Sequence, residues 1–242
     1  TSGKILKKVV DATAFAVSRD ELKPALTGVL MQISQEKITA VSTDGHRLVK
    51  YVRNDFKSEG FSGEIVVPKK FLLYLSGQLQ NQDVVLSIGE SHLTAKFDKD
   101  VVLTRVISEK FPDYQSVIPK DNNKKLLVEK EVLLGAIRRV SIFSNKATHQ
   151  VALSLENGSI KIKTEDPEKS SKGEESISAK FEGDPITIGY NAEYLKDIVG
   201  HVQGEFVEVE LGTPVSAALF SSQNNNEDSE SLMLLMPIRL ND

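Results

Sequence analysis

The chain has 242 residues, of which 40% are hydrophobic and 26% charged, so it can form one large or two ordinary globular domains. It contains no cysteine, which excludes disulfides, thiolate nucleophiles and cysteine-based zinc sites. Its four histidines lie far apart in the sequence without metal-ligand spacing, so neither a metal nor another cofactor is expected. No apolar run approaches the roughly 18 residues of a membrane span, and no signal-peptide pattern opens the chain, which predicts a cytoplasmic protein without membrane contact.

The formal net charge of −4 does not by itself indicate nucleic-acid binding, because phosphate-binding surfaces are built from lysine and arginine. The charges are nevertheless segregated along the sequence. Acidic residues gather at 165–168, 174–175 and 227–230, and basic residues gather at Lys4, Lys7 and Lys8, at Lys69–Lys70 and at Arg138–Arg139. Such segregation permits a basic face on an acidic protein.

The first half of the chain is predicted to contain a helix, β-strands, a second helix and further strands. Residues 4–16 place Ile5, Leu6, Val9 and Val10 at helical spacing beside lysines, which is typical of an amphipathic helix. Strands are predicted at 29–33, 37–41, 48–52 and 63–67, a helix at 69–79, and strands at 84–88 and 94–97.

The second half repeats this order. A helix is predicted at 130–143, followed by strands at 151–155 and 159–163, a strand at 186–188, a helix at 192–201, and strands at 207–211 and 217–220. Glu156-Asn157-Gly158 joins the first two of these strands, a strong hairpin signal because Asn and Gly tolerate positive φ.

The spacing between matching residues supports an internal repeat. Phe15 and Phe143 are 128 residues apart, Asp44 and Asp166 are 122 apart, and Ile65 and Ile186 are 121 apart. The pattern predicts an α+β protein of two like domains, at 1–119 and 126–242, joined by the polar segment Pro119–Lys125. Two polar tracts, Thr164 to Ser176 and Ser221 to Ser231, are predicted to be exposed loops.

Ser42 to Leu48 is the most polar compact segment. Asp44-Gly45 between two strands is typical of a hairpin turn, with His46 on the surface. The alternative is a hydrolase in which Asp44 orients His46 as a general base, but that chemistry also needs a nucleophile and an oxyanion site, and no recognisable motif supplies them.

The apolar C-terminal segment, 232–240, has two interpretations. It can be a final core strand that Pro237 ends. Because apolar residues continue to Ile238 and Leu240, it can also line a docking groove.

Three ordered motifs carry a family resemblance: Thr43-Asp44-Gly45-His46-Arg47-Leu48, Phe111-Pro112-Asp113-Tyr114 and Met236-Pro237-Ile238-Arg239-Leu240. With the duplication, they resemble the middle and C-terminal domains of the bacterial DNA polymerase III beta subunit, the sliding clamp. The resemblance implies a DNA-clamp fold of tandem repeat domains, each with two helices packed on antiparallel sheets, acting as a processivity factor rather than an enzyme.

The resemblance further implies that the helices face duplex DNA without reading its sequence. The basic side chains expected to do so are Lys4, Lys7, Lys8, Lys69, Lys70, Arg138, Arg139 and Lys196. Contacts of this kind are salt-sensitive and compatible with sliding.

It also implies a groove between the domains that takes a Gln-x-x-Leu-Phe-like peptide from polymerases, the clamp loader and repair proteins. The residues carried over to this groove are Leu26, Thr43, Gly45, His46, Arg47, Leu48, Pro112, Val117, Asn191, Tyr194, Val215, Met233, Leu234, Leu235, Met236, Pro237, Ile238 and Arg239. Asn241-Asp242 extend beyond the usual family ending and are expected to crowd this groove.

Family members form homodimeric rings, closed between the first domain of one subunit and the last domain of the next. The family's first domain has no counterpart here, so the chain is expected to be a fragment and a monomer that cannot encircle DNA alone. A duplicated binding module unrelated to DNA is the other alternative.

Overall fold

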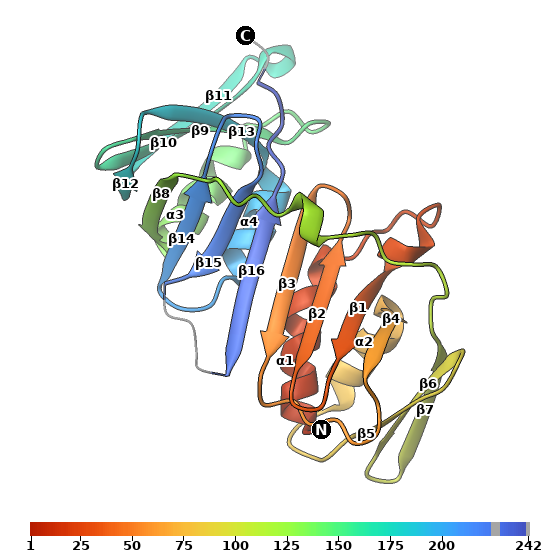
Figure 1. Cartoon of the computed structure of the whole chain (residues 1–242). Coiled ribbons are helices and arrows are strands. Elements are labelled where there is room, and N and C mark those ends of the chain that lie inside the picture. Colours follow the sequence, from red (N-terminus) through yellow and green to blue (C-terminus); the bar gives the residue numbers. More distant parts are fainter. Residues whose placement is uncertain (224–227, 241–242) are drawn as a thin grey trace. The chain divides into compact units, whose positions relative to one another are not determined.

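The computed structural model describes residues 1–223 and 228–240 (Figure 1). Within these, the chain divides into two compact units: the first holds residues 1–114 and the beginning of the last strand up to Leu232, and the second holds 115–223 and 233–240. The predicted loop at 221–231 lies partly, and Asn241–Asp242 wholly, outside the described residues. Residues 221–222 and 229–231 belong to strands, so the loop prediction is wrong there. The units divide between Tyr114 and Gln115, which is before the predicted linker at 119–125. The last two residues of that predicted linker, Lys124 and Lys125, belong to a strand.

The first unit combines two helices with two antiparallel sheets. In one sheet, β3, β2, β1 and β4 lie next to one another in that order, and the other sheet has the order β5-β6-β7. The elements are α1 (Gly3–Thr13), β1 (Gly28–Ile33), β2 (Ile38–Thr43), β3 (Arg47–Arg53), β4 (Gly63–Pro68), α2 (Lys69–Gln78), β5 (Val85–Ile88), β6 (His92–Phe97) and β7 (Asp100–Arg105).

Helix α1 forms where the sequence predicts it, although its α-helical part ends at Thr13 and a 3-10 turn continues to Ala16. The hydroxyl of Ser2 accepts a hydrogen bond from the Lys4 amide at 3.2 Å and so caps the first turn. The buried face of the helix carries Leu6, Val9 and Val10. Helices α1 and α2 pack against each other, and α1 also contacts β2 and β3.

The second unit repeats this architecture. Its elements are β8 (Lys124–Glu129), α3 (Lys130–Ser141), β9 (Gln150–Glu156), β10 (Ser159–Asp166), β11 (Ser171–Ser178), β12 (Lys180–Glu182), β13 (Ile186–Asn191), α4 (Ala192–His201), β14 (Phe206–Leu211), β15 (Ala218–Ser222) and the end of β16 (Ser229–Leu235). One sheet has the order β11-β10-β9-β13, which corresponds to the order β3-β2-β1-β4 of the first unit. In another sheet, β12, β8, β14, β15 and β16 lie next to one another in that order. The predicted α+β repeat with helices on antiparallel sheets is confirmed.

The prediction of an exposed loop at Thr164 to Ser176 is wrong. Strand β10 continues to Asp166, and β11 pairs with it from Ser171 onward. Every second residue of β10 is buried, including Thr164 and Asp166. The side chain of Asn145 donates a hydrogen bond to the Asp166 carboxylate at 3.2 Å. Protein hydrogen bonds allow these polar groups to be buried. The polar composition of the segment therefore predicted a loop where the chain forms a half-buried hairpin.

Tyr190 in β13 carries a buried hydroxyl that has no hydrogen-bond partner among the described residues. Burial raises the pKa of this phenol above its usual range. Since an unsatisfied buried polar group costs about 1–3 kcal/mol, Tyr190→Phe is expected to raise the free energy of unfolding by about 1 kcal/mol in urea denaturation.

Tyr114→Phe is the matched control, because the Tyr114 hydroxyl donates to the Gln32 side chain at 2.9 Å. This variant is expected to lose stability. A Tyr190→Phe variant that is destabilised to the same extent would show that its hydroxyl is satisfied.

Candidate DNA-facing and peptide-binding residues

The turn between β2 and β3 is held by Asp44 and Arg47. The Asp44 carboxylate accepts hydrogen bonds from the amides of His46 and Arg47 at 2.9 and 3.0 Å, and from the Arg47 guanidinium at 3.1 Å. Arg47 also donates to the Phe15 carbonyl at 3.1 Å and lies 5.4 Å from the Phe15 ring centroid. The predicted turn is therefore a cross-linked structure in which Asp44 fixes the backbone, which leaves little support for Asp44 as the orienting group of a hydrolase.

Members of the predicted peptide-binding set in the first unit differ in exposure. Thr43, Arg47 and Leu48 are buried, whereas Gly45, His46 and Pro112 are exposed and Leu26 is half-buried. The Thr43 hydroxyl donates to the Arg47 carbonyl at 2.7 Å and accepts from the Gly45 amide at 3.1 Å. The buried members thus build the turn that presents Gly45 and His46.

In the second unit, most of the predicted set lies in or just after β16 or at the start of α4, while Val117 and Val215 lie in other segments. Met233, Leu234 and Leu235 are buried in β16, which ends at Leu235, two residues before Pro237. The side chain of Asn191 caps α4 by accepting from the amides of Glu193 and Tyr194 at 2.9 and 3.3 Å. The remaining members reach the surface to different degrees: Val117, Val215, Met236 and Arg239 are exposed, and Asn191, Tyr194, Pro237 and Ile238 are half-buried.

The segment after β16 is fixed against β13 at a glycine. The Ile238 amide donates to the Gly189 carbonyl at 2.9 Å. A Cβ added at Gly189 would lie 2.7 Å from both the Ile238 carbonyl and the Leu240 side chain, closer than such atoms approach. Glycine at 189 is therefore what allows residues 238–240 to lie on this strand, which sequence reasoning did not identify.

The eight predicted DNA-facing cations all lie on helices. Lys4 and Lys8 on α1, Lys70 on α2, and Arg138 and Arg139 on α3 are exposed. Half-buried members are Lys7 and Lys69 in the first unit and Lys196 in the second. The Lys7 ammonium donates to the Ser76 carbonyl in the last turn of α2 at 2.9 Å, a position favoured by the helix dipole.

Two of these cations in the second unit form ion pairs. The Arg139 guanidinium binds the Glu175 carboxylate of β11 through two hydrogen bonds of 2.9 and 2.6 Å, and the Lys196 ammonium lies 2.6 Å from Glu193. The hydrogen bond to Arg139 lowers the pKa of Glu175 below its usual range. In both pairs a carboxylate occupies the cation that is predicted to meet phosphate.

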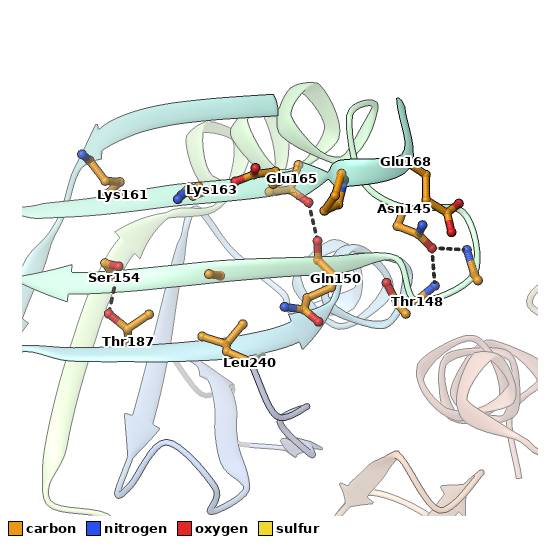
Figure 2. A pocket seen from close by; sticks show the side chains of 14 residues that line it. Asn145, Thr148, Gln150, Ser154, Lys161, Lys163, Glu165, Glu168, Thr187 and Leu240 are labelled. Carbon is orange, nitrogen blue, oxygen red and sulfur yellow. Dashed lines mark hydrogen bonds between the residues drawn. The ribbon is translucent and has the colours of Figure 1, made fainter. Parts of the chain in front are cut away.

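The second unit also holds an open groove of about 970 Å³ that the sequence did not predict (Figure 2). It is lined by Asn145, Ala147, Thr148, Gln150, Ala152, Ser154, Lys161, Lys163, Thr164, Glu165, Pro167, Glu168, Thr187 and Leu240. Several polar side chains that line the groove already have partners. Ser154 and Thr187 share a hydrogen bond of 2.9 Å, and Lys161 forms an ion pair with Glu174 at 3.0 Å.

Neither a metal centre nor a membrane span is found within residues 1–223 and 228–240. No group of three His, Asp or Glu side chains in this part of the chain is placed to hold a metal ion. None of its helices is long and apolar enough to cross a membrane.

Two α+β units that share one four-stranded order and each carry a packed helix pair define a tandem-repeat protein of the clamp type. The chain belongs to the DNA polymerase III beta subunit family: the family's C-terminal domain matches residues 115–239, and its central domain matches residues 1–113.

Named relatives agree with this assignment. The chain is 32% identical to the beta sliding clamp of Pseudomonas putida over 237 residues, and 31% identical to that of Vibrio cholerae. These alignments cover 97% of this chain but only 64% and 63% of the relatives.

Solved structures are similar over nearly the whole chain. The DNA polymerase sliding clamp of Pseudomonas aeruginosa has a TM-score of 0.93 at 29% identity, covering 99% of this chain and 66% of that one. A sliding clamp from Bartonella birtlesii bound to griselimycin has a TM-score of 0.92 at 31% identity, covering 99% and 65%.

Proposed function

We propose that this chain supplies the central and C-terminal domains, residues 1–119 and 126–242, of a DNA polymerase processivity factor without catalytic activity. The observation that carries the proposal is the match of both family domains, in order, along the chain. In this proposal the protein acts in the cytoplasm, encircles duplex DNA as part of a ring, slides without sequence preference, and docks polymerases, the clamp loader and repair proteins.

The exposed part of the predicted peptide-binding set is suited to this docking. Val215 is 67% exposed, Val117 53% and Met236 41%, so apolar side chains are available to a Leu-Phe motif. Burying such side chains contributes about 1.5–3 kcal/mol each. After the cost of association, micromolar affinity, about −8 kcal/mol, is expected.

A surface of the second unit is suited to ring closure. Strand β11 is the last strand of its sheet. Phe143, which lies against Gly173 of β11, is 43% exposed, and its chain neighbour Ile142 is 77% exposed. Edge strands and exposed apolar side chains favour pairing with another polypeptide. We propose this surface as the side of the ring contact that the chain supplies, with the chain alone remaining a monomer.

Docking is tested by titrating a fluorescent Gln-Leu-x-Leu-Phe peptide and measuring its anisotropy. Saturable micromolar binding is expected. Met236→Ala removes an exposed apolar contact and is expected to weaken binding by about tenfold, which corresponds to about 1.4 kcal/mol, without a change in stability.

Leu22→Ala is the matched control, because Leu22 is 91% exposed and lies outside the predicted set. Leu48→Ala is unsuitable as a binding variant, since Leu48 is only 2% exposed and its truncation would cost about 2–5 kcal/mol of stability. Equal affinity for the specific and a scrambled peptide would favour the unrelated binding module over the clamp.

A further inference from the structure

The two helix pairs of this chain differ in charge. Helices α1 and α2 carry five lysines and one acidic residue, Asp11. Helices α3 and α4 carry four lysine or arginine residues and three acidic residues. The formal charge of the helix pair is therefore clearly positive in the first unit and nearly balanced in the second.

Local partners increase this difference. Among the described residues, no carboxylate lies within ion-pair distance of Lys4, Lys8 or Lys70, and all three are exposed. The single acid of this helix pair, Asp11, accepts a hydrogen bond from the Ser76 hydroxyl of α2 at 2.8 Å. These three lysines can therefore meet a phosphate without first breaking an ion pair to any residue of 1–223 or 228–240.

Most of the cations on helices α3 and α4 of the second unit already have a protein partner. Arg139 is bound by Glu175 and Lys196 by Glu193. Lys130 points to the end of α4, where its ammonium donates to the Val202 carbonyl at 2.9 Å. Among the four cations of α3 and α4, Arg138 alone is exposed and has no ion pair with another described residue.

The two helices of the first unit, α1 and α2, also lie side by side. A Cβ added at Gly3 would lie 2.9 Å from the Gln82 carbonyl and 3.4 Å from Leu79, so the start of α1 lies beside the end of α2. Helices α1 and α2 pack against each other, so their exposed lysines belong to one packed pair. This arrangement gathers positive charge on one helix pair, as contact with phosphates requires.

We propose that the phosphate contacts of this chain are concentrated on the α1–α2 pair of the first unit, and that Glu175 holds Arg139 back from DNA. The inference rests on the proposed DNA-facing role of the helices. It assigns to one unit a contact that the family resemblance distributes over both.

The test compares two triple variants of the full chain that lose the same charge. One combines Lys4→Ala, Lys8→Ala and Lys70→Ala; the other combines Arg138→Ala, Arg139→Ala and Lys196→Ala. Binding of a fluorescent duplex is measured by anisotropy from low to moderate salt, and thermal unfolding checks that both variants are folded.

Each phosphate contact contributes about 0.9 to the slope of log K against log salt. The lysine triple variant is expected to reduce the magnitude of this negative slope by about two to three. The Arg138, Arg139 and Lys196 triple variant is expected to reduce it by about one. Glu175→Gln is expected to strengthen binding by releasing Arg139, with no gain when Arg139→Ala is added.

The outcomes separate the inference from the function on which it rests. Equal losses in the two triple variants, or a larger loss in the second, would overturn the inference while leaving DNA binding intact. No binding of duplex by the unaltered chain at low salt would overturn the DNA-facing role itself and the inference with it.

Discussion

Arg47→Ala is expected to lower the free energy of unfolding by about 3 kcal/mol, because it removes one partner of a buried ion pair. The side chains of Arg47 and Asp44 are 9% and 13% exposed, so the remaining carboxylate would be left largely desolvated. The substitution also removes the contacts to Phe15. Urea denaturation measures the loss.

The same substitution is expected to abolish peptide binding even under conditions where the variant is fully folded. Gly45 and His46 are presented by the turn that Asp44 and Arg47 hold. Arg53→Ala is the matched control, since Arg53 is a buried arginine at the other end of β3, paired with Asp55. It should lose stability and keep its peptide affinity; equal loss of affinity in both variants would show that the turn has no special role.

Gly189→Ala is expected to weaken peptide binding by at least about tenfold, or about 1.4 kcal/mol. The new Cβ meets the Ile238 backbone carbonyl at 2.7 Å, and a backbone atom cannot move aside as a flexible side chain can. Residues 236–240 must therefore shift away from β13, and Pro237, Ile238 and Arg239 move with them. Anisotropy titration measures the effect.

Gly200→Ala provides the control in the same unit. Nothing lies within 4 Å of a Cβ added at Gly200 in α4, so this change should raise stability by about 0.5–1 kcal/mol and leave peptide affinity unchanged. Unaltered affinity in Gly189→Ala would mean that the segment after β16 takes no part in docking.

Much of the fold could be predicted because its signals are local and repeated. Apolar spacing predicted α1 and α3, and Asn157-Gly158 predicted the hairpin between β9 and β10, where Gly158 has a φ of 89°. The hairpin of β10 and β11 was missed because its inward positions include Thr164 and Asp166, whose burial depends on hydrogen bonds that only the folded chain provides.

The candidate sites were predictable in part. The motif around Asp44 indicated a turn, but no sequence pattern shows that Arg47 is buried and Gly45 exposed. Likewise, Arg139 and Lys196 look like Lys4 and Lys8 in sequence. Arg139 pairs with Glu175 of strand β11, whereas Lys196 pairs with Glu193 of its own helix. Only the pair of Arg139 and Glu175 needs tertiary structure to form.

Hydrogen exchange of the chain with and without the Gln-Leu-x-Leu-Phe peptide tests the docking site most directly. Slower exchange is predicted around Gly45 and His46 and in residues 233–239, with little change on β10. Slower exchange confined to the polar groove between Asn145 and Glu168, or no change anywhere at saturating peptide, would contradict the assignment.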